Sequence, residues 1–476
     1  MTLETLFTLK LLIIGLLCIT SRLPIKLMQV QTLSKWMKMV LALGAFLSLA
    51  MMILSFNGQP LNLSLFTFKE LGISFRLDRL SAIMLFMVTT IGLVVIRFSS
   101  TYLQGENKHA SFMRRMLATI ACVQILVLSG NLFILVLSWI GTSVGLHQLL
   151  LFYKERTAAQ KAARKKFFIA RLSDLSIIAA AVLIYLTFNS GDLATIFQQL
   201  EQGVANEQLV KLEFAGFFLV SAAAFKSVQI PFHGWLLDLM ETPTPVSGLL
   251  HAGLLNAGPF LVIRFAYVMD AISIAPIVLV ILGGITAIYG SLVYTSQSAV
   301  KTALAYSSIA HMGFSLMVCG FGLYAASLLH FTAHSFYKAH AFLSSGSLVD
   351  KYRNRLALPP ALAHFSIFKV LIGILIVFLI FGGIAEITGD LYTLSFQLTV
   401  LSSIILIGIS TFLVRTLFYK NAFTFYLKNT VIAMIIVGSF LGFEHLMSAY
   451  LGNQIPTVKE VSTTLIVLSI ALIISF

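Results

Sequence analysis

The sequence predicts an all-α, polytopic membrane protein with about 13–15 transmembrane helices of about 20 residues each. Hydrophobic residues make up 58% of the 476 positions and charged residues only 11%, whereas soluble domains carry about 25% charged residues. The mean hydropathy is +0.95. The net charge of +14 comes from short loops between apolar runs, which is the pattern that bilayer topology produces. We therefore expect a membrane protein without a nucleic-acid partner.

About fifteen apolar runs along the chain are long enough to be membrane helices. They fall near 6–20, 37–56, 80–100, 113–129, 132–152, 167–188, 212–230, 244–268, 274–294, 300–321, 323–349, 362–382, 396–416, 428–447 and 461–475. The longest pieces between them are 57–79 and 189–211, and neither is long enough for a soluble domain. Cys18, Cys122 and Cys319 lie in apolar runs, which is typical of packing residues and not of disulfides or metal ligands.

Basic residues gather in the loops after odd-numbered helices, for example at 108–115, 154–166 and 351–355. Loops after even-numbered helices carry acids instead, such as Asp192 and Asp270. The positive-inside rule then predicts that the odd loops are cytoplasmic and that the N-terminus lies outside, in a bacterial inner membrane. The run 154–166 has a second interpretation, in which it binds anionic lipid or an acidic soluble partner.

The segment 226–251 places unusual residues inside a chain that otherwise spans the membrane. Its notable members are Lys226, Pro231, His233, Trp235, Asp238, Glu241, Pro243, Pro245 and His251. A charge in the hydrocarbon costs roughly 2.5–3.5 kcal/mol, so such residues usually serve transport. Prolines break helices and free backbone groups, which is tolerated only beside protein or a water-filled cavity. The segment is therefore predicted to be part of an ion pathway.

Lys226 falls some fourteen residues into its predicted helix, near the middle of the membrane. Burial favours its neutral form and a nearby carboxylate favours its charged form, so a lysine balanced between the two can exchange a proton. Alternatively, it forms a structural ion pair that fixes helix packing. Asp174 is the candidate carboxylate, but it also lies three residues after Arg171 and can pair with it on one helical face.

A histidine-rich run extends the predicted polar line. His330, His334 and Lys338 recur every four residues and share one helical face, whereas His340 does not. A neutral imidazole donates with one nitrogen and accepts with the other, which suits a proton relay at His251 and along this face. Structural packing is the alternative, and a zinc site is disfavoured because no third ligand is evident. Further candidates are Lys301, His311 and Lys369.

The motifs in these runs resemble one family of membrane proteins. They are SFRLDRLSAIM at 74–84, TYLQGE at 101–106, RLSD at 171–174, PFHGWLLDLMETPTPVSGLLHA at 231–252, VKTALAYSSIAHMG at 300–313 and HFTAHSFYKAHAFLSSGS at 330–347. Over about 74–349 the chain resembles the antiporter-like subunits of respiratory complex I and Mrp-type cation/proton antiporters. The resemblance implies two inverted five-helix repeats with broken helices and a central axis of charged residues. It gives conducting or gating roles to Lys226, His251, His330, His334 and Lys338.

The same resemblance implies a division of the chain. Residues 1–110 hold N-terminal transmembrane helices, 111–270 the first repeat, 271–420 a second repeat that diverges after 350, and 421–476 C-terminal transmembrane helices. Lys369 is then the second broken-helix lysine. Relatives usually carry a glutamate after the fifth-helix tryptophan, but here Ile140 follows Trp139. Asp174 is therefore the expected substitute partner of Lys226.

A short chain with these departures resembles the membrane subunits of the DAB inorganic-carbon accumulation complexes. That resemblance implies a large cytoplasmic zinc protein of the DabA or MpsB type, similar to a β-carbonic anhydrase, as the partner. It implies zinc in the partner, no cofactor or metal in this chain, and a conducting subunit that is not itself an enzyme. Two alternatives stay open, namely a subunit of a cation/proton antiporter or NADH-quinone oxidoreductase, and a membrane scaffold that no longer conducts.

Overall fold

A computed structural model describes residues 2–22, 30–68, 71–346, 367–388, 395–416, 422–457 and 463–475. Its helices are α1 Leu3–Arg22, α2 Val30–Leu54, α3 Arg79–Tyr102, α4 His109–Val127, α5 Leu132–Leu150, α6 Thr157–Phe188, α7 Leu193–Glu201, α8 Asn206–Lys226, α9 Gly234–Leu237, α10 Thr244–Ala252, α11 Ala257–Arg264, α12 Ala266–Ala271, α13 Ile274–Thr295, α14 Val300–Gly320, α15 Tyr324–Leu343, α17 Ile367–Thr388, α18 Phe396–Thr416, α19 Ala422–Leu451 and α20 Thr463–Ser475. Short 3₁₀ turns are η2 Asp238–Glu241, η3 Leu254–Asn256 and η4 Gly452–Gln454.

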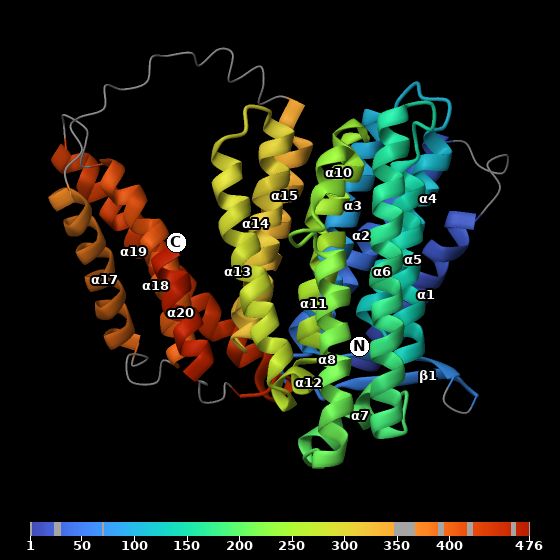
Figure 1. The fold of residues 1–476 in the computed structure, drawn as a ribbon. Helices are drawn as coiled ribbons and strands as arrows, with labels where there is room; N and C mark the ends of the chain where they lie inside the picture. Colours follow the sequence, from blue (N-terminus) through green and yellow to red (C-terminus); the bar gives the residue numbers. More distant parts are fainter. Residues whose placement is uncertain are drawn as a thin grey trace.

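The helices stand side by side as a bundle (Figure 1). Within the described ranges, eleven helical stretches are long and apolar enough to cross a membrane. Each predicted apolar run overlaps at least one helix of the structure. The predicted class, an all-α polytopic membrane protein, is confirmed.

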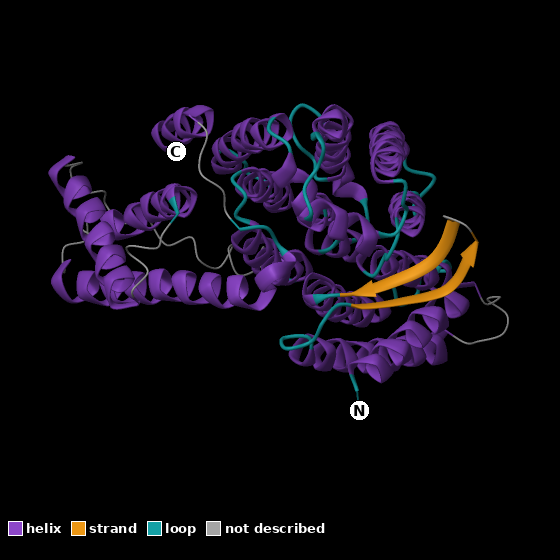
Figure 2. Ribbon diagram, turned by 90° about the horizontal axis from the view of Figure 1, so that it is seen from below, coloured by secondary structure: helices purple, strands orange, loops and turns teal. Residues whose placement is uncertain are grey.

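Two segments predicted as connections have structure of their own. Residues 57–79 contain the antiparallel hairpin of β1 Leu61–Phe68 and β2 Leu71–Leu77, which is the orange pair in Figure 2. Residues 189–211 contain α7. Isolated bridges pair Phe75 with Ser129 and Asn131 with Asp192, so the hairpin and the start of α7 lie together at one end of the bundle.

The basic connections lie together away from this hairpin. Lys108 Nζ is 3.0 Å from a carboxylate oxygen of Glu155, which joins the loop before α4 to the loop before α6. Lys165 Nζ is 2.6 Å from Asp238, which joins α6 to η2. The bundle therefore has one end rich in basic loops and another end that carries the hairpin and α7.

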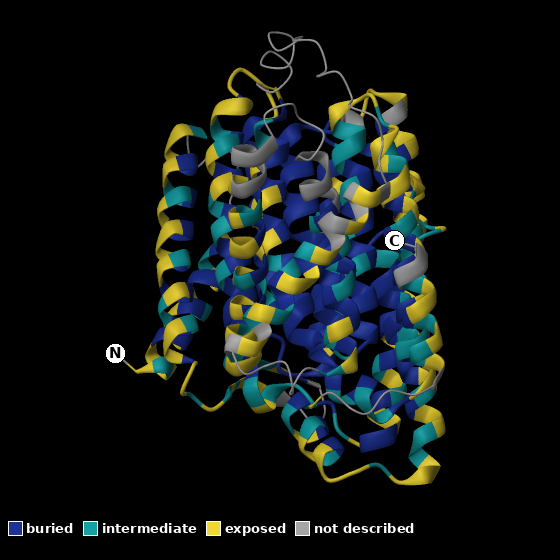
Figure 3. Ribbon diagram, turned by 90° about the vertical axis from the view of Figure 1, so that its left-hand side faces the viewer, coloured by how far each residue is buried: buried dark blue, intermediate teal, exposed yellow. Residues whose placement is uncertain are grey.

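The segment from α10 to α11 is the centre of the bundle. Every residue in the stretch Thr244–Arg264 is buried, whereas only 17% of the apolar window in the C-terminal α19 is. Figure 3 shows the same gradient, with buried residues inside and exposed residues around the periphery. A helix that is apolar on all sides belongs inside a protein and not against solvent on one face. His251 is thereby placed in the protein interior.

Small residues allow α13 and α14 to approach closely. A Cβ added at Gly313 would lie 2.7 Å from the backbone of Gly283 and Ala287, and one at Gly290 would lie 2.8 Å from Ala310 N. Such close contact between helix backbones is a common way to pack transmembrane helices. It fixes the helix that carries His311.

The predicted helix break is present at Pro231. Helix α8 ends at Lys226, and a non-helical stretch that includes Pro231 separates it from α9 and η2. Proline cannot donate a backbone hydrogen bond and clashes with the preceding turn, which explains the stop. A second interruption at Gly253 separates α10 from η3 and α11. The helix that carries Lys226 therefore ends inside the bundle.

Candidate functional site

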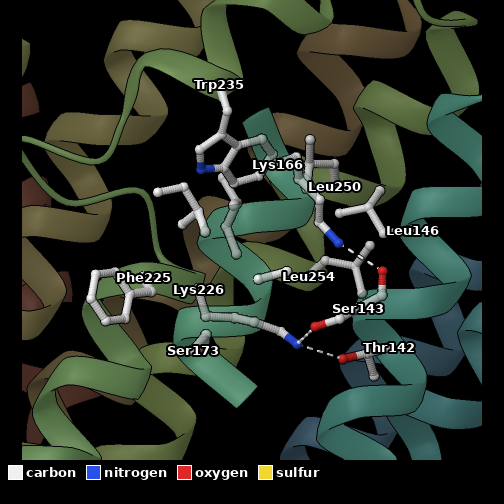
Figure 4. Close-up of a pocket in the computed structure, with 13 residues that line it drawn as sticks. Thr142, Ser143, Leu146, Lys166, Ser173, Phe225, Lys226, Trp235, Leu250 and Leu254 are labelled. Carbon is white, nitrogen blue, oxygen red and sulfur yellow. Dashed lines mark hydrogen bonds between the residues drawn. The ribbon is translucent and has the colours of Figure 1, made fainter. Parts of the chain in front are cut away.

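Lys226 is held by oxygen atoms of α5, and no carboxylate among the described residues bonds it directly. Its Nζ donates to Trp139 O at 3.0 Å, Thr142 Oγ1 at 2.8 Å and Ser143 Oγ at 2.8 Å. The ammonium also lies 4.5 Å from the centre of the Trp139 ring, a cation–π contact. Two hydroxyl groups and a backbone carbonyl of α5 therefore bond Lys226 in a chain that has Ile140 in place of the usual glutamate of relatives. Figure 4 shows the lysine reaching across to Thr142 and Ser143.

Asp174 joins both of its candidate partners. Its carboxylate forms a 2.5 Å ion pair with Arg171 on the same helix. The other carboxylate oxygen accepts a hydrogen bond from Ser143 Oγ at 3.3 Å, and that hydroxyl accepts from Lys226. The two interpretations of Asp174 are therefore both realised, with the contact to Lys226 made through one hydroxyl group.

Lys166 belongs to this site, although its residue range was expected to be a loop. The prediction that α6 begins near 167 is wrong, because the helix begins at Thr157. Lys166 is 5% exposed, and its Nζ donates to Ser143 O at 2.7 Å. A cavity of about 20 Å³ is lined by Lys166, Lys226, Trp235 and Leu250, among others. That volume is room for about one water molecule.

A short chain of hydrogen bonds locks the three helices around this cavity. Trp139 Nε1 donates to Ser173 Oγ at 3.2 Å, and Ser173 Oγ donates to Ala222 O at 2.9 Å. Trp139 comes from α5, Ser173 from α6 and Ala222 from α8. All three residues are buried. Buried polar groups that are fully bonded rigidify a core, so the oxygen cage around Lys226 is held in place.

Three histidines form a second cluster on α14 and α15. His311 Nδ1 lies 3.1 Å from His330 Nε2, and the rings of His311 and His334 are 4.5 Å apart. Both ring nitrogens of His334 are buried, and neither has a hydrogen-bond partner in the part of the chain that the structure describes. Cavities of about 670 and 490 Å³ adjoin the cluster. His311 and His330 therefore border open space, whereas the ring nitrogens of His334 are buried behind them.

Lys338 and His251 lie where α10 meets α15. Lys338 is fully buried, and its Nζ donates to Leu304 O of α14 at 3.0 Å. The His251 ring stacks on Phe342 with centroids 4.2 Å apart, and its Nδ1 has no hydrogen-bond partner. Asn256 Nδ2 donates to Ser335 Oγ at 2.6 Å, which ties the central segment to the histidine helix. Leu250, next to His251, lines the cavity of Lys226.

The remaining signature residues surround the break in α8. Trp235 is buried and lines the Lys226 cavity, and the His233 ring contacts Tyr289 at 5.5 Å. Asp238 pairs with Lys165. Pro243 and Pro245 stand at the start of α10, where proline is favoured. The side chain of Glu241 lies outside the described part of the structure.

Two candidate lysines are not placed at either cluster. Lys301 is the second residue of α14 and is half-buried, about ten residues, or roughly 15 Å, before His311. Lys369 falls in α17, but its side chain lies outside the described part. His340, expected on another face, is exposed. Across the described ranges, no group of three or more His, Cys, Asp or Glu side chains is arranged to hold a metal ion.

A buried ion pair stabilises the hairpin end of the bundle. Asp78 accepts from Arg264 and, at 3.0 Å, from Arg76 Nε, and its carboxylate also caps α3 through Ser81 N at 2.9 Å. Burial alone would raise the pKa of Asp78, but the two guanidinium groups and the Ser81 hydrogen bonds hold that pKa well below its usual value. This pair is a structural anchor distant in sequence from the lysine site.

Sequence reasoning missed four residues that the structure places at buried polar positions. Thr142 and Ser143 carry no distinguishing signal in the sequence, and Lys166 falls in the predicted loop 154–166. Lys166, Ala170 and Asp174 are spaced four apart, so the helical period could have indicated a shared face. Lys10 of α1 is also fully buried, with its Nζ bonded to Gly44 O at 3.1 Å and Thr89 Oγ1 at 3.0 Å.

Comparison with known proteins identifies the class. The family model for "NADH:quinone oxidoreductase/Mrp antiporter, TM" matches residues 129–364, and that for the N-terminus of complex I chain 5 matches residues 66–113. The chain belongs to this family of antiporter-like membrane subunits.

The chain is similar in sequence to curated relatives of two kinds, namely inorganic-carbon transporter subunits and a complex I subunit. The chain is 37% identical over 279 residues to the probable inorganic carbon transporter subunit DabB of Hydrogenovibrio crunogenus, which covers 58% of this chain and 54% of the relative. It is 40% identical over 284 residues to subunit DabB2 of Halothiobacillus neapolitanus, with 60% and 51% covered. It is 34% identical to NADH-ubiquinone oxidoreductase chain 5 of Metridium senile, with 58% and 45% covered. The chain thus spans about half the length of these relatives.

Solved structures show the same fold. The Mrp complex from Dietzia sp. DQ12-45-1b matches with a TM-score of 0.66 at 19% identity, over 100% of this chain and 55% of the other. The membrane-bound sulfane sulfur reductase, an archaeal respiratory membrane complex, matches with a TM-score of 0.64 at 15% identity, over 99% and 93%. At these identities the likeness concerns the fold alone.

Proposed function

We propose that the chain is the ion-conducting membrane subunit of an inorganic-carbon accumulation complex. The observation that carries the proposal is the buried Lys226, whose ammonium is bonded to hydroxyl and carbonyl oxygens and reaches Asp174 only through Ser143. A direct carboxylate would favour the charged form of the lysine, whereas a lysine bonded to uncharged oxygen atoms loses its proton more readily. The DabB relatives support the carbon-transport part.

The ion that suits this site is the proton. Lys226, Lys166, Arg171 and Lys338 are all basic, and a sodium ion entering among them would be repelled. Imidazole and amine groups exchange protons, and His311, His330 and His334 lie within ring-contact distance of one another. The path we propose comprises Asp174, Lys226, His251, Lys338 and the histidine cluster. Lys301 and Lys369 remain candidates for its outer parts.

The charges at the two ends of the bundle support the membrane orientation that we propose. The end with Lys108, Lys165 and their partners carries the basic loops, and the positive-inside rule places it in the cytoplasm. The hairpin end and the N-terminus then lie outside, in a bacterial inner membrane. A large soluble zinc protein resembling a β-carbonic anhydrase docks on the cytoplasmic end in this proposal and carries the zinc chemistry.

A second candidate function is a subunit of a cation/proton antiporter or a respiratory oxidoreductase. The family models and the complex I relative favour it, and so does the fold likeness to the Mrp complex. The missing fifth-helix glutamate, replaced here by Ile140, argues against it because that family's usual ion pair cannot form in this chain. Identifying the partner proteins would distinguish the two candidate functions.

The deciding experiment is affinity purification of the tagged chain from native membranes in mild detergent, followed by mass spectrometry and a zinc assay. One large soluble partner with about one zinc supports the carbon-transport complex. Cells that carry Lys226→Ala should then lose bicarbonate accumulation, whereas Ser221→Ala on the same helix should keep it. Several small antiporter-type subunits, or flavin and iron–sulfur proteins, would contradict the carbon-transport proposal.

A further inference from the structure

Lys165 and Lys166 are neighbours in the sequence but lie in opposite environments. The Lys165 side chain is 62% exposed and pairs with Asp238. Lys166 is 5% exposed, and its ammonium donates to a backbone carbonyl, Ser143 O, at 2.7 Å. Burying a lysine without a direct carboxylate is costly, so its retention calls for a function other than stability.

Lys166 and Lys226 converge on one residue. Lys226 donates to Ser143 Oγ and Lys166 donates to Ser143 O, and both line the cavity that has room for about one water. Figure 4 shows the two ammonium groups approaching Ser143 from α8 and α6. Two amines that share a hydroxyl-bearing residue and a water-sized space have a short route for a proton between them.

The charges at this site disfavour protonation of both lysines together. The nearby carboxylate, Asp174, is already paired with Arg171, so one negative charge faces three basic groups. Like charges in a low-dielectric interior repel strongly. Protonation of one lysine therefore promotes proton loss by the other. This coupling is what a relay needs and what a structural ion pair lacks.

We infer that Lys166 is a proton-relay residue that exchanges a proton with Lys226 and connects it to the end of the bundle with the basic loops. In the step, an N–H bond of the Lys226 ammonium breaks, and the proton passes through a water molecule in the cavity that both lysines line. It then forms an N–H bond on the neutral Lys166 amine. Lys226 is left neutral, Lys166 becomes charged, and no electrons are transferred. The inference rests on the proposed function and adds a residue to its path.

The test is proton flux into liposomes that contain the full chain, purified in the complex in which it occurs, with a trapped pH-sensitive dye. Lys166→Met removes the amine and keeps the apolar stem, and Lys165→Met is the matched control. Lys166→Arg keeps the charge and the hydrogen-bond donors but cannot release a proton. Lys166→Gln keeps a donor without charge and replaces the Met variant if that one does not fold. Melting temperatures establish that each variant is folded.

The expected result is at least a tenfold lower flux for Lys166→Met and Lys166→Arg, with Lys165→Met within twofold of the wild type. Flux in Lys166→Met close to that of Lys165→Met would overturn the relay while leaving the proposed function intact. Recovery of flux in Lys166→Arg would overturn it as well, because a fixed structural charge would then suffice. A wild type no faster than Lys226→Met would remove the proposed function and this inference with it.

Discussion

The lysine site and the histidine cluster differ in the hydrogen-bond partners of their ionisable groups and in the volume of the adjoining cavity. At the lysine site, α5 supplies three oxygen ligands to Lys226, and the adjoining cavity is only about 20 Å³. At the histidine cluster, His334 has two unpartnered nitrogens, beside a cavity of about 670 Å³. A closed cage holds one proton position tightly, whereas an open cluster offers several. Under the proposed function, we expect the lysine site to act as the gate and the histidines to provide proton access.

Asp78 lies outside the proposed proton path, so its substitution shows the effect of lost stability alone. Asp78→Asn leaves Arg264 buried beside a neutral amide, which should destabilise the folded chain by about 3 kcal/mol. Thermal unfolding in detergent measures the loss. The control is Asp192→Asn at another helix cap, whose carboxylate accepts from Thr195; asparagine caps helices about as well as aspartate, so this change should cost only a few tenths of a kcal/mol.

The pH dependence of this stability follows from the lowered pKa of Asp78. A depressed folded-state pKa means that the stabilisation is complete above the unfolded value of about 3.9 and fades as the pH falls through the folded value. The difference in melting temperature between wild type and Asp78→Asn should therefore be constant from about pH 5 to 8. A difference that changed across this range would contradict the ion-pair assignment.

The oxygen cage is expected to show the largest effect on conduction short of removing the lysine. Thr142→Val with Ser143→Ala removes two of the three bonds to the Lys226 ammonium. Hydrogen bonds to a charged group contribute about 1.5–3 kcal/mol each, so flux should fall by about thirtyfold or more. Ser138→Ala on the same helix is the control, because its hydroxyl bonds only backbone of its own helix. Equal flux in the two variants would show that the hydrogen bonds from Thr142 and Ser143 to Lys226 do not contribute to conduction.

Restoring a carboxylate should also slow conduction. Ile140 lies three residues before Ser143 on α5, so a glutamate there shares its face. Ile140→Glu would hold Lys226 in its charged form, and we expect about tenfold lower flux. Ile140→Gln has the same size without the charge and should change flux much less. Faster flux in the glutamate variant would show that the neutral cage is not the working arrangement.

The open histidine cluster should tolerate change better than the cage. His334→Ala leaves His311 and His330 bonded to each other, so a route remains and flux should fall by only about threefold to fivefold. The exposed His340, one and a half turns further along α15, is the control, and His340→Ala should have no effect. A loss in His334→Ala as large as that in the cage variant would erase the distinction between the two regions.

Sequence patterning was sufficient for the membrane class, the approximate positions of the apolar helices and the break before Pro231, since these depend on local hydropathy and on proline, but it missed the start of α6 and the interruption at Gly253. It was insufficient for the hairpin of β1 and β2, although L-N-L-S-L at 61–65 alternates in the manner of a strand. It also left Asp174 between two partners. That choice depends on where Ser143 of a neighbouring helix lies, and no spacing within one helix encodes it.

The burial of Lys166 shows the same limit. Its basic neighbours indicated a loop, but α6 extends through them, and the helical phase turns Lys165 outward and Lys166 inward. The cavity they adjoin is formed by residues of several helices, so its size could not be inferred from any one of them. Lys301 and Lys369 stay predictions, and so does the division into two repeats.

The central claim is that protons cross the membrane through Lys226, and proton flux into liposomes tests it most directly. The wild-type complex should acidify liposomes in response to an imposed membrane potential. Lys226→Met, which keeps the apolar stem and removes the amine, should reduce the flux to that of liposomes without protein. Flux in Lys226→Met equal to that of the wild type, in a folded complex, would contradict the account.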